Sequence, residues 1–357
     1  MARKRVAVIA GEDASPEAVH PTIEILHALA LDIDFALPAV GAEGLRTCGD
    51  LFPAGARKSI DEADAVLFGA ASAAAIPALF YLRWGRQTYA NLRPARWIPG
   101  FQSPLADPEG IDIALVRENL EDVYAGVEGD LAQLAPLDLQ SLTWGRPLAA
   151  LGPGTFALKV ITERGAERVL RFAFALAQRR KRAGRPGRLT CTQKHNMLFV
   201  SDGLFRRTAE RLATEFADVD LEVLIIDDFA HRLVRRPQDF DVVVMPNLYG
   251  DILSDAAAGL IGGLGLAPSG CYGDSFAYFE PCHGTAPDLA GKNCINPTAT
   301  ILSAVMMLEH LGYDAAARAL DAAVAAVYGA GRWLTPDQGG AASTTEFCRA
   351  VTDMIRM

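Results

Sequence analysis

The sequence contains few cysteines and no uninterrupted apolar stretch of about 18 residues, and each absence excludes a class of protein. The six cysteines are scattered, without the C-x-x-C pairs or histidine spacing of zinc sites, so we expect reduced, mostly buried thiols. Without a long apolar run the chain is not predicted to span a membrane. The first short apolar run ends too early for the core of a signal peptide. We therefore expect a cytoplasmic protein.

Basic residues are also in deficit, because 34 Lys and Arg are outnumbered by 43 Asp and Glu and the formal net charge is -9. Such a charge disfavours binding to nucleic acids and to anionic membranes. The one basic cluster is Arg179-Arg180-Lys181-Arg182, which a glycine and a proline soon follow. Since cations are favoured at the C-terminus of a helix, we interpret this cluster as a solvated helix end. Neither nucleic acid nor membrane is expected as a partner.

Short apolar runs alternate with helical patterns, and this alternation predicts the fold class. Hydrophobic residues make up 50% of the 357, which is enough for a large core and for two domains. The strand-like runs are residues 6–10, 65–68, 111–116, 223–226 and 242–245. Helical patterns return over residues 298–311 and 315–328. The sequence therefore predicts an α/β fold in which helices flank parallel or mixed sheets.

One fingerprint is lacking and one segment has no clear pattern. The G-x-G-x-x-G motif of an ordinary Rossmann fold does not follow the first strand, where the chain reads Gly11-Glu12-Asp13-Ala14-Ser15-Pro16-Glu17. A nucleotide site must therefore be built differently.

Residues 126–154 are rich in Leu, Ala, Pro, Gln and Gly. They form either a loop or an arm that reaches a partner subunit, because a stretch this long is usually functional or interfacial.

A pair of carboxylates follows the apolar run at residues 242–245. Asp251 and Asp255 are four residues apart and share one helix face, where like charges repel each other unless they share a cation. Hard oxygen ligands of this kind suit Mg²⁺ or Mn²⁺. A third carboxylate, Asp227, follows the run at 223–226. Taken alone, an Asp pair at a helix start is more often a cap or a partner of the helix dipole.

Three arginines and two proton-transfer candidates complete the polar set. Guanidinium groups bind carboxylates in pairs of hydrogen bonds, so Arg83, Arg93 and Arg117 predict a substrate with at least two carboxylates. Singly, each arginine is more often part of a structural ion pair. The phenol of Tyr124 can protonate a carbanion, and the amine of Lys194 can be neutral when a cation is close. Alone, they would be a packing residue and a surface lysine.

A turn-rich loop near residue 283 carries several groups that could bind a nucleotide. An Asp in such a loop can accept both ribose hydroxyls and repel a 2′-phosphate. The candidate cofactor-binding residues are Glu280, His283, Gly284, Thr285, Ala286, Pro287, Asp288 and Asn296.

Taken together and in this order, these segments resemble the isocitrate/isopropylmalate dehydrogenase family of β-decarboxylating dehydrogenases. The family includes isocitrate, 3-isopropylmalate, homoisocitrate and tartrate/D-malate dehydrogenases. The resemblance covers nearly the whole chain. Its segments are Tyr89-Ala90-Asn91-Leu92-Arg93-Pro94, Arg117-Glu118-Asn119, Lys194-His195-Asn196, Ser201-Asp202-Gly203-Leu204-Phe205, residues 247–255 and residues 280–297.

The resemblance implies an isopropylmalate dehydrogenase-like fold of two domains. Residues 1–94 and 256–357 would form the cofactor-side domain, and residues 95–255 the dimerisation and metal-side domain. It also implies a homodimer with shared active sites, in which Lys194 and Asp227 reach across to the partner chain. Asp227 would then join Asp251 and Asp255 as a ligand of Mg²⁺ or Mn²⁺.

The implied reaction is the oxidative decarboxylation of a substituted malate, a small di- or tricarboxylate. Arg83, Arg93 and Arg117 would clamp its carboxylates. Lys194 would remove the hydroxyl proton while hydride leaves for the cofactor, and Tyr124 would protonate the carbon that has lost CO₂. Asp288 resembles the loop of NAD-dependent members, whereas NADP-dependent members have lysine there, so the expected cofactor is NAD.

Two departures from the family pattern affect the substrate and the cofactor. Where the family usually has Gly-Asp-Gly-Ile-Gly-Pro-Glu, two glycines are replaced in the loop at residues 11–17, so we expect a different backbone path near the cofactor. Before Arg83, isocitrate-type members have Ser and Asn, but this chain has Pro77, Leu79 and Phe80. Apolar groups here would leave a γ-carboxylate without partners.

The apolar residues favour a 3-isopropylmalate-like substrate, although alternatives stay open. If Phe80 fills the pocket, the substrate is D-malate or tartrate, and isocitrate or homoisocitrate is a further alternative. The altered loop also allows a non-catalytic regulatory subunit of the same family.

Overall fold

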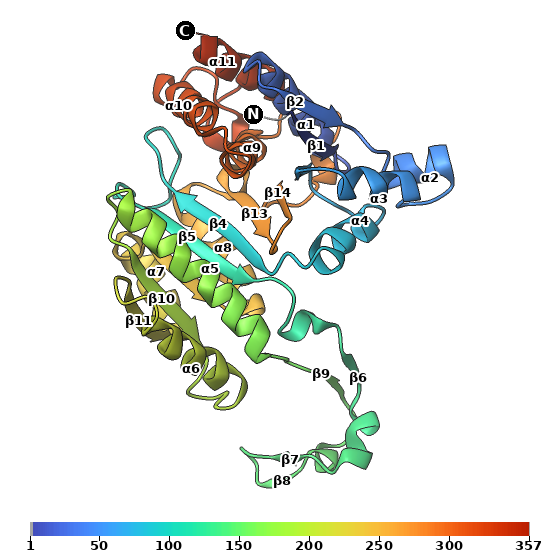
Figure 1. Ribbon diagram of the computed structural model, residues 1–357, viewed down its shortest axis with the longest axis vertical. Coiled ribbons are helices and arrows are strands. Elements are labelled where there is room, and N and C mark those ends of the chain that lie inside the picture. The colour runs from blue at the N-terminus through green and yellow to red at the C-terminus, as the bar shows by residue number, and fades with distance from the viewer. Residues whose placement is uncertain (1–2, 357) are drawn as a thin grey trace.

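A twisted sheet of ten strands forms the centre of the molecule, which we describe for residues 3–356 in a computed structural model (Figure 1). Its strands are β1 (Lys4–Ile9), β2 (Ile33–Ala36), β3 (Ala65–Phe68), β4 (Ala90–Arg96), β5 (Asp112–Glu118), β10 (Arg188–Gln193), β11 (Asp220–Ile225), β12 (Val242–Met245), β13 (Pro268–Tyr272) and β14 (Ala277–Pro281). The strand order is β11-β10-β12-β5-β4-β13-β14-β3-β1-β2. Pairing is antiparallel between β5 and β4, β4 and β13, and β13 and β14, and parallel elsewhere.

Helices cover both faces of this sheet. They are α1 (Ser15–Ala28), α2 (Ala42–Cys48), α3 (Ala54–Asp61), α4 (Ile76–Phe80), α5 (Glu163–Arg182), α6 (Ser201–Ala213), α7 (Ile226–Arg235), α8 (Asn247–Ile261), α9 (Thr298–His310), α10 (Asp314–Ala330) and α11 (Thr344–Arg356). The α/β prediction, with a largely parallel sheet, is confirmed. Nearly every side chain of α9 is buried, because α9 contacts β13 and β14 on one side and α1 and α10 on others. Within residues 3–356 no helix is both long and apolar enough to cross a membrane.

The ends of the chain and its middle occupy different parts of the molecule. In Figure 1, α1 and α9–α11 gather with β1 and β2 on one side of β4 and β13, whereas α5–α7 lie with β10–β12 on the other. The division into two domains, with boundaries at residues 94 and 255, stays a prediction.

Residues 126–154 lie in a projecting arm (Figure 1). The strands β6 (Glu128–Asp130) and β9 (Thr155–Ala157) pair antiparallel and lead away from the sheet to a small hairpin of β7 (Gln140–Ser141) and β8 (Arg146–Pro147). At the tip, Leu142 is 88% exposed and Trp144 is 56% exposed. Leu137 and Leu139 on the same arm are also exposed, and exposed apolar side chains that gather on one segment mark a contact surface, so the tip is a candidate for one.

Side-chain alternation along β4 assigns residues to two faces of the sheet. Arg93 donates to Asn91 on its own strand and to Ser254 on α8, so both strand residues face α8. Successive side chains of a strand point to opposite faces, which directs Pro94 and Arg96 to the other side, where α9 and the end of α5 lie.

The six cysteines are free thiols, as expected. Three of the six, Cys191, Cys271 and Cys348, are buried. The expectation that most of the thiols would be buried is therefore correct for only half of them.

Candidate active site

The two predicted metal-binding carboxylates lie on α8, which packs closely against β5. Gly250 allows this approach, because a Cβ at that position would lie 2.6 Å from the Cβ of Arg117. At the start of the helix, the Asn247 side chain accepts a hydrogen bond from Arg117 Nε at 2.8 Å and donates one to the Glu121 carbonyl at 3.1 Å. The sequence at the start of α8 thus fixes the distance between the helix and the strand, and thereby the position of Asp251.

Three arginines converge on this region from three elements. Arg93 of β4 donates to Asp255 at 3.0 Å, Arg117 of β5 pairs with Asp251, and Arg83 lies in a π-helical turn (Tyr81–Gly85). Arg93 is 8% exposed and Arg117 is 2% exposed. Burial together with Arg93 and Arg83 lowers the pKa of Arg117 to about 10. The structure therefore brings the three predicted carboxylate clamps together.

Arg83 has a free donor that a ligand could use. Its Nη2 lies 3.7 Å from Glu280 Oε1 on β14, whereas its Nε is buried and has no hydrogen-bond partner within residues 3–356. A buried donor without a partner costs free energy, which a bound carboxylate would recover. Burial raises the pKa of Glu280, although Arg83 and Arg93 oppose that rise.

Tyr124 joins the same cluster. Its hydroxyl donates to Asp251 Oδ2 at 2.6 Å, and the Arg117 guanidinium lies 5.2 Å from the centre of its ring. The turn that carries it (Val123–Ala125) starts at Asp122, which has a φ of 68° and accepts hydrogen bonds from Val123 N and Leu248 N. Burial and the hydrogen bond to Asp251 raise the pKa of Tyr124. The phenol therefore keeps its proton at neutral pH.

The two carboxylates on α8 differ in acidity. Burial alone would raise the pKa of Asp251, but Arg117 and the Tyr124 hydroxyl hold it below its usual value. Burial raises the pKa of Asp255, because Arg93 compensates for it only in part. Their side chains are 32% and 45% exposed, so both can still reach a ligand. Two adjacent carboxylates form a donor set that fits Mg²⁺ or Mn²⁺.

The third predicted ligand does not join them within one chain. Asp227 lies in the first turn of α7 and forms an ion pair with Lys194, which follows β10. Within residues 3–356 no three His, Cys, Asp or Glu side chains are close enough to hold a cation. The structure thus forms two half-sites, one with Asp251 and Asp255 and the other with Lys194 and Asp227.

Lys194 is held by a network of hydrogen bonds and ion pairs that the sequence analysis did not predict. The Lys194 backbone N–H donates to Asp202 Oδ2 at 2.8 Å, and the Tyr249 hydroxyl donates to the same oxygen at 3.2 Å. Lys159 lies 2.7 Å from Asp202 Oδ1 and 3.6 Å from Asp122. Asp202 and Asp122 are fully buried, so Lys159 compensates two buried negative charges. The network joins the turn of Lys194, the turn of Tyr124 and the base of the arm.

The predicted specificity residues lie on α4, next to Arg83. Phe80 is 54% exposed and its ring centre is 4.9 Å from that of Trp84. Trp84 donates to the Leu120 carbonyl at 3.1 Å, and the Arg83 guanidinium is 5.5 Å from its ring centre. Leu79 packs partly into the core cluster beneath the helix. Phe80 and Trp84 therefore form an apolar surface beside Arg83, with the Phe80 ring largely exposed.

A separate cavity of about 450 Å³ collects most of the predicted cofactor residues. His283, Gly284, Thr285, Ala286 and Asn296 line it together with Ser15, Gly265, Leu289, Cys294, Ile295, Pro336 and Asp337. Pro287 and Asp288 follow Ala286 in a short turn, whereas Glu280 lies apart, on β14. His283 Nδ1 donates to the Gly284 carbonyl at 2.8 Å, and its buried Nε2 has no hydrogen-bond partner within residues 3–356. Burial lowers the pKa of His283, so the ring is neutral. A neutral imidazole and an amide suit the adenine and ribose of a dinucleotide.

The altered loop at residues 11–17 borders this cavity. The Glu12 carboxylate accepts hydrogen bonds from Ser72 N and Ala75 N at 2.8 and 3.0 Å, just before α4. Ala14 N donates to the Thr285 carbonyl at 3.1 Å. The loop thus connects the start of α4, through Glu12, to the cavity, through Ala14.

Comparisons with known proteins agree with this geometry. The family model for isocitrate/isopropylmalate dehydrogenase matches residues 5–355. A 3-isopropylmalate/3-methylmalate dehydrogenase of Methanocaldococcus jannaschii is 41% identical over 352 residues, covering 99% of each chain. An isocitrate/homoisocitrate dehydrogenase of Thermus thermophilus is 39% identical over 361 residues, covering 99% of this chain and 98% of the other.

A solved structure has the same fold. An isocitrate dehydrogenase from Methylococcus capsulatus superposes with a TM-score of 0.85 at 31% identity, covering 99% of this chain and 100% of the other. The predicted resemblance is confirmed, and with it an enzyme that oxidises a CH–OH group and decarboxylates its substrate. The chain belongs to the isocitrate/isopropylmalate dehydrogenase family.

Proposed function

We propose that the chain catalyses the NAD-dependent and divalent-metal-dependent oxidative decarboxylation of a 3-alkylmalate of the 3-isopropylmalate type. One observation carries the proposal: Arg93, Arg117 and Tyr124 all contact Asp251. Arg83 lies beside this cluster and pairs with Glu280. Family members act on small carboxylates, and relatives named 3-isopropylmalate dehydrogenase are among the most similar. The exposed ring of Phe80 beside Arg83 suits an alkyl substituent better than a third carboxylate.

The arginines bind the substrate and orient it. Arg93 and Arg117 are fixed by hydrogen bonds to Ser254 and Asn247, so their remaining donors have a defined direction toward a carboxylate. Arg83 adds its free Nε from the α4 side. Their three positive charges compensate the charge of the dianion in a region with little water.

Lys194 and Tyr124 move the protons. Lys194 accepts the proton of the 2-hydroxyl group, and the protonated phenol of Tyr124 delivers one to C3 after CO₂ has left. A bound divalent cation would lower the pKa of that hydroxyl and stabilise developing negative charge, and bound NAD would supply the hydride acceptor. Asp227, Asp251 and Asp255 would hold the cation. Mg²⁺ and Mn²⁺ both suit such oxygen ligands.

Two copies of the chain would complete each active site as a homodimer. The half-site of Lys194 and Asp227 adjoins the apolar segment at residues 197–200, in which Phe199 is 64% exposed and Val200 is 73% exposed. Beside the other half-site, Ile252 on α8 is 59% exposed. Burial of these surfaces between two copies would bring the half-sites together. The projecting arm offers a further contact for the partner.

The cavity at His283 would hold the adenosine part of NAD. Its lining combines a neutral imidazole with apolar side chains such as Ile295 and Leu289. Asp288, close to that lining, would accept the ribose hydroxyls and repel the phosphate of NADP. The six free thiols suit a reducing compartment, which supports the cytoplasm as the location.

A substrate panel tests the proposal. NADH or NADPH formation would be measured with Mg²⁺ and with Mn²⁺ for 3-isopropylmalate, D-malate, tartrate, isocitrate and homoisocitrate. We expect the highest kcat/KM with 3-isopropylmalate and NAD. A preference for D-malate or tartrate would mean that Phe80 fills the pocket, and a preference for isocitrate would refute the alkyl pocket. Inactivity toward all five, with NAD still binding, would favour a regulatory subunit.

A further inference from the structure

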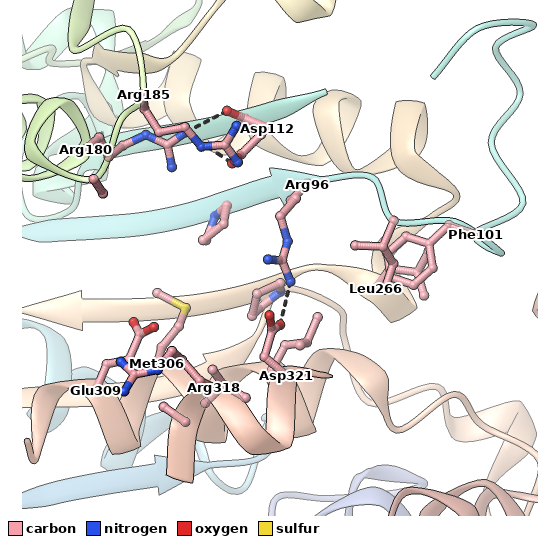
Figure 2. A pocket seen from close by; sticks show the side chains of 17 residues that line it. Arg96, Phe101, Asp112, Arg180, Arg185, Leu266, Met306, Glu309, Arg318 and Asp321 are labelled. Atoms are coloured by element: carbon pink, nitrogen blue, oxygen red, sulfur yellow. Dashed lines mark hydrogen bonds and ion pairs between the residues drawn. The ribbon is translucent and has the colours of Figure 1, made fainter. Parts of the chain in front are cut away.

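A groove lined by arginines lies on the face of the sheet opposite to the active site (Figure 2). It starts as a cavity of about 340 Å³ between α9 and α10 on one side and β4, β5 and the end of α5 on the other. A second cavity of about 560 Å³ continues it, and both are lined by Pro94, Arg180, Ala183, Met306 and Glu309. We call the two cavities together the rear groove.

The rear groove and the active site share two strands. On β4, Arg93 faces α8, whereas Pro94 and Arg96 line the groove. On β5, Arg117 faces α8, whereas Asp112 lines the groove. The alternation of strand side chains therefore places the groove directly behind the residues that bind the substrate's carboxylates.

The floor of the rear groove is apolar. It is built from Ile98, Phe101, Leu266, Leu302, Val305 and Met306. These side chains are between 1% and 9% exposed, and they come from segments far apart in the sequence. A preformed apolar cavity of this size accommodates the body of a small organic molecule.

Positive charge dominates the rim, although the whole chain is negative. The charged residues that line the groove are Arg96, Arg179, Arg180, Arg185 and Arg318 against Asp112, Glu309 and Asp321. Figure 2 shows that Arg96 pairs with Asp321 and that Arg180 and Arg185 share Asp112.

Two of the five arginines are not engaged by the protein. Arg179 and Arg318 form no ion pair or side-chain hydrogen bond in the part of the chain that the structure describes. Glu309, which lines both cavities, is one of the three acidic residues that face these five arginines, and burial raises its pKa. The excess of guanidinium groups attracts an anion to this site.

We propose that the rear groove is a binding site for a small organic anion, a carboxylate on an apolar body of roughly six carbons, and that its occupant alters substrate binding. The apolar body lies on the floor at Met306 and Phe101, and the carboxylate meets Arg318, while Arg179 adds positive charge in the cavity that continues the groove. One wall belongs to α9 and α10 and the other to β5 and α5, so an occupant fixes the separation of the walls. Because the same strands hold Arg93 and Arg117, the substrate's affinity changes with that separation. By thermodynamic linkage, the substrate must then change the affinity of the groove for the anion by the same factor as the anion changes the affinity of the active site for the substrate.

The binding test uses hexanoate as the probe and does not depend on turnover. Isothermal titration of the full-length protein should give saturable binding of hexanoate and much weaker binding of hexan-1-ol and hexylammonium. The double variant Arg179→Gln and Arg318→Gln should weaken hexanoate binding by about tenfold or more, because it removes a charge-assisted hydrogen bond at Arg318 and the positive charge of Arg179. Arg349→Gln, an exposed arginine on α11, is the matched control and should bind hexanoate normally.

Each outcome decides the proposal. Absence of saturable binding, equal binding by the double variant, or equal binding of hexan-1-ol would overturn the anion site. If the site holds, hexanoate should change the KM of the preferred substrate by about fivefold or more in wild type and not in the double variant. Binding without any change in KM would overturn the coupling. A wrong assignment of the substrate would leave the titration results intact, so the two failures are distinguishable.

Discussion

Replacement of Tyr124 by phenylalanine separates the oxidation from the final proton transfer. The substitution removes the hydroxyl that lies 2.6 Å from Asp251 Oδ2, but it keeps the ring that lies 5.2 Å from the Arg117 guanidinium. Because the side chain is only partly buried, the lost hydrogen bond should cost about 1 kcal/mol of folding stability. Loss of a positioned proton donor should lower kcat by about 10² to 10⁴-fold.

The time course of NADH formation distinguishes the loss of the proton donor from general damage to the site. If Tyr124 acts only after hydride transfer, the variant should form a rapid burst of NADH, at most equal to its active sites, followed by slow turnover. Stopped-flow absorbance measures the burst, and thermal unfolding measures the stability. Tyr313→Phe, which removes a hydroxyl that donates to the Asp32 carbonyl far from the site, is the matched control and should behave as wild type. A kcat within about threefold of wild type would refute the role, since general acid catalysis contributes far more.

Three further perturbations test other parts of the site. Lys194→Met should abolish steady-state turnover and also the NADH burst, because the lysine acts before hydride transfer; a normal burst in stopped-flow absorbance would contradict this order. Removal of divalent metal with EDTA should stop the reaction, and added Mn²⁺ should raise the Tm of wild type but not of Asp255→Asn in a thermal-shift assay. Burial raises the pKa of Glu118 to about 7, so folding favours its protonated form. The protonated Glu118 therefore contributes fully to the free energy of unfolding below its ordinary pKa near 4.5. This contribution, about 3 kcal/mol at most, is lost as the pH rises through 7. Urea unfolding across this pH range should show that loss in wild type and little of it in Glu118→Gln; identical pH profiles would refute the assignment.

Strands with continuous apolar runs could be predicted from the sequence, whereas a strand that contains proline could not. The runs at 65–68 and 242–245 coincide with β3 and β12, because strands buried on both faces of a parallel sheet are apolar throughout. β4 was not predicted, since Pro94 within it lacks the N–H group that a central strand normally uses. The run at 111–116 continues to Glu118, because pairing with β4 extends β5. Arg117 therefore lies in the strand and not after it.

Residue chemistry located the candidate site only in part. The four-residue spacing placed Asp251 and Asp255 on one helix face, as predicted. Their contacts with Arg117 and Arg93 depend on packing between α8 and two strands, which no local pattern encodes. Lys159 was missed for a similar reason, because a single lysine between apolar residues resembles a surface lysine until tertiary folding brings it to Asp202. The loop at residues 11–17 was recognised as a departure because two glycines are replaced in it, but the contacts of Glu12 to the start of α4 follow only from the structure.

The most direct test of the proposed reaction measures NADH and CO₂ together when the protein is incubated with 3-isopropylmalate, NAD and Mn²⁺. We predict equal molar amounts of the two products, at a rate that Arg93→Gln strongly reduces because the variant has lost one of the substrate's carboxylate clamps. Formation of NADH without CO₂, or failure to form either product while another malate derivative reacts, would contradict the account.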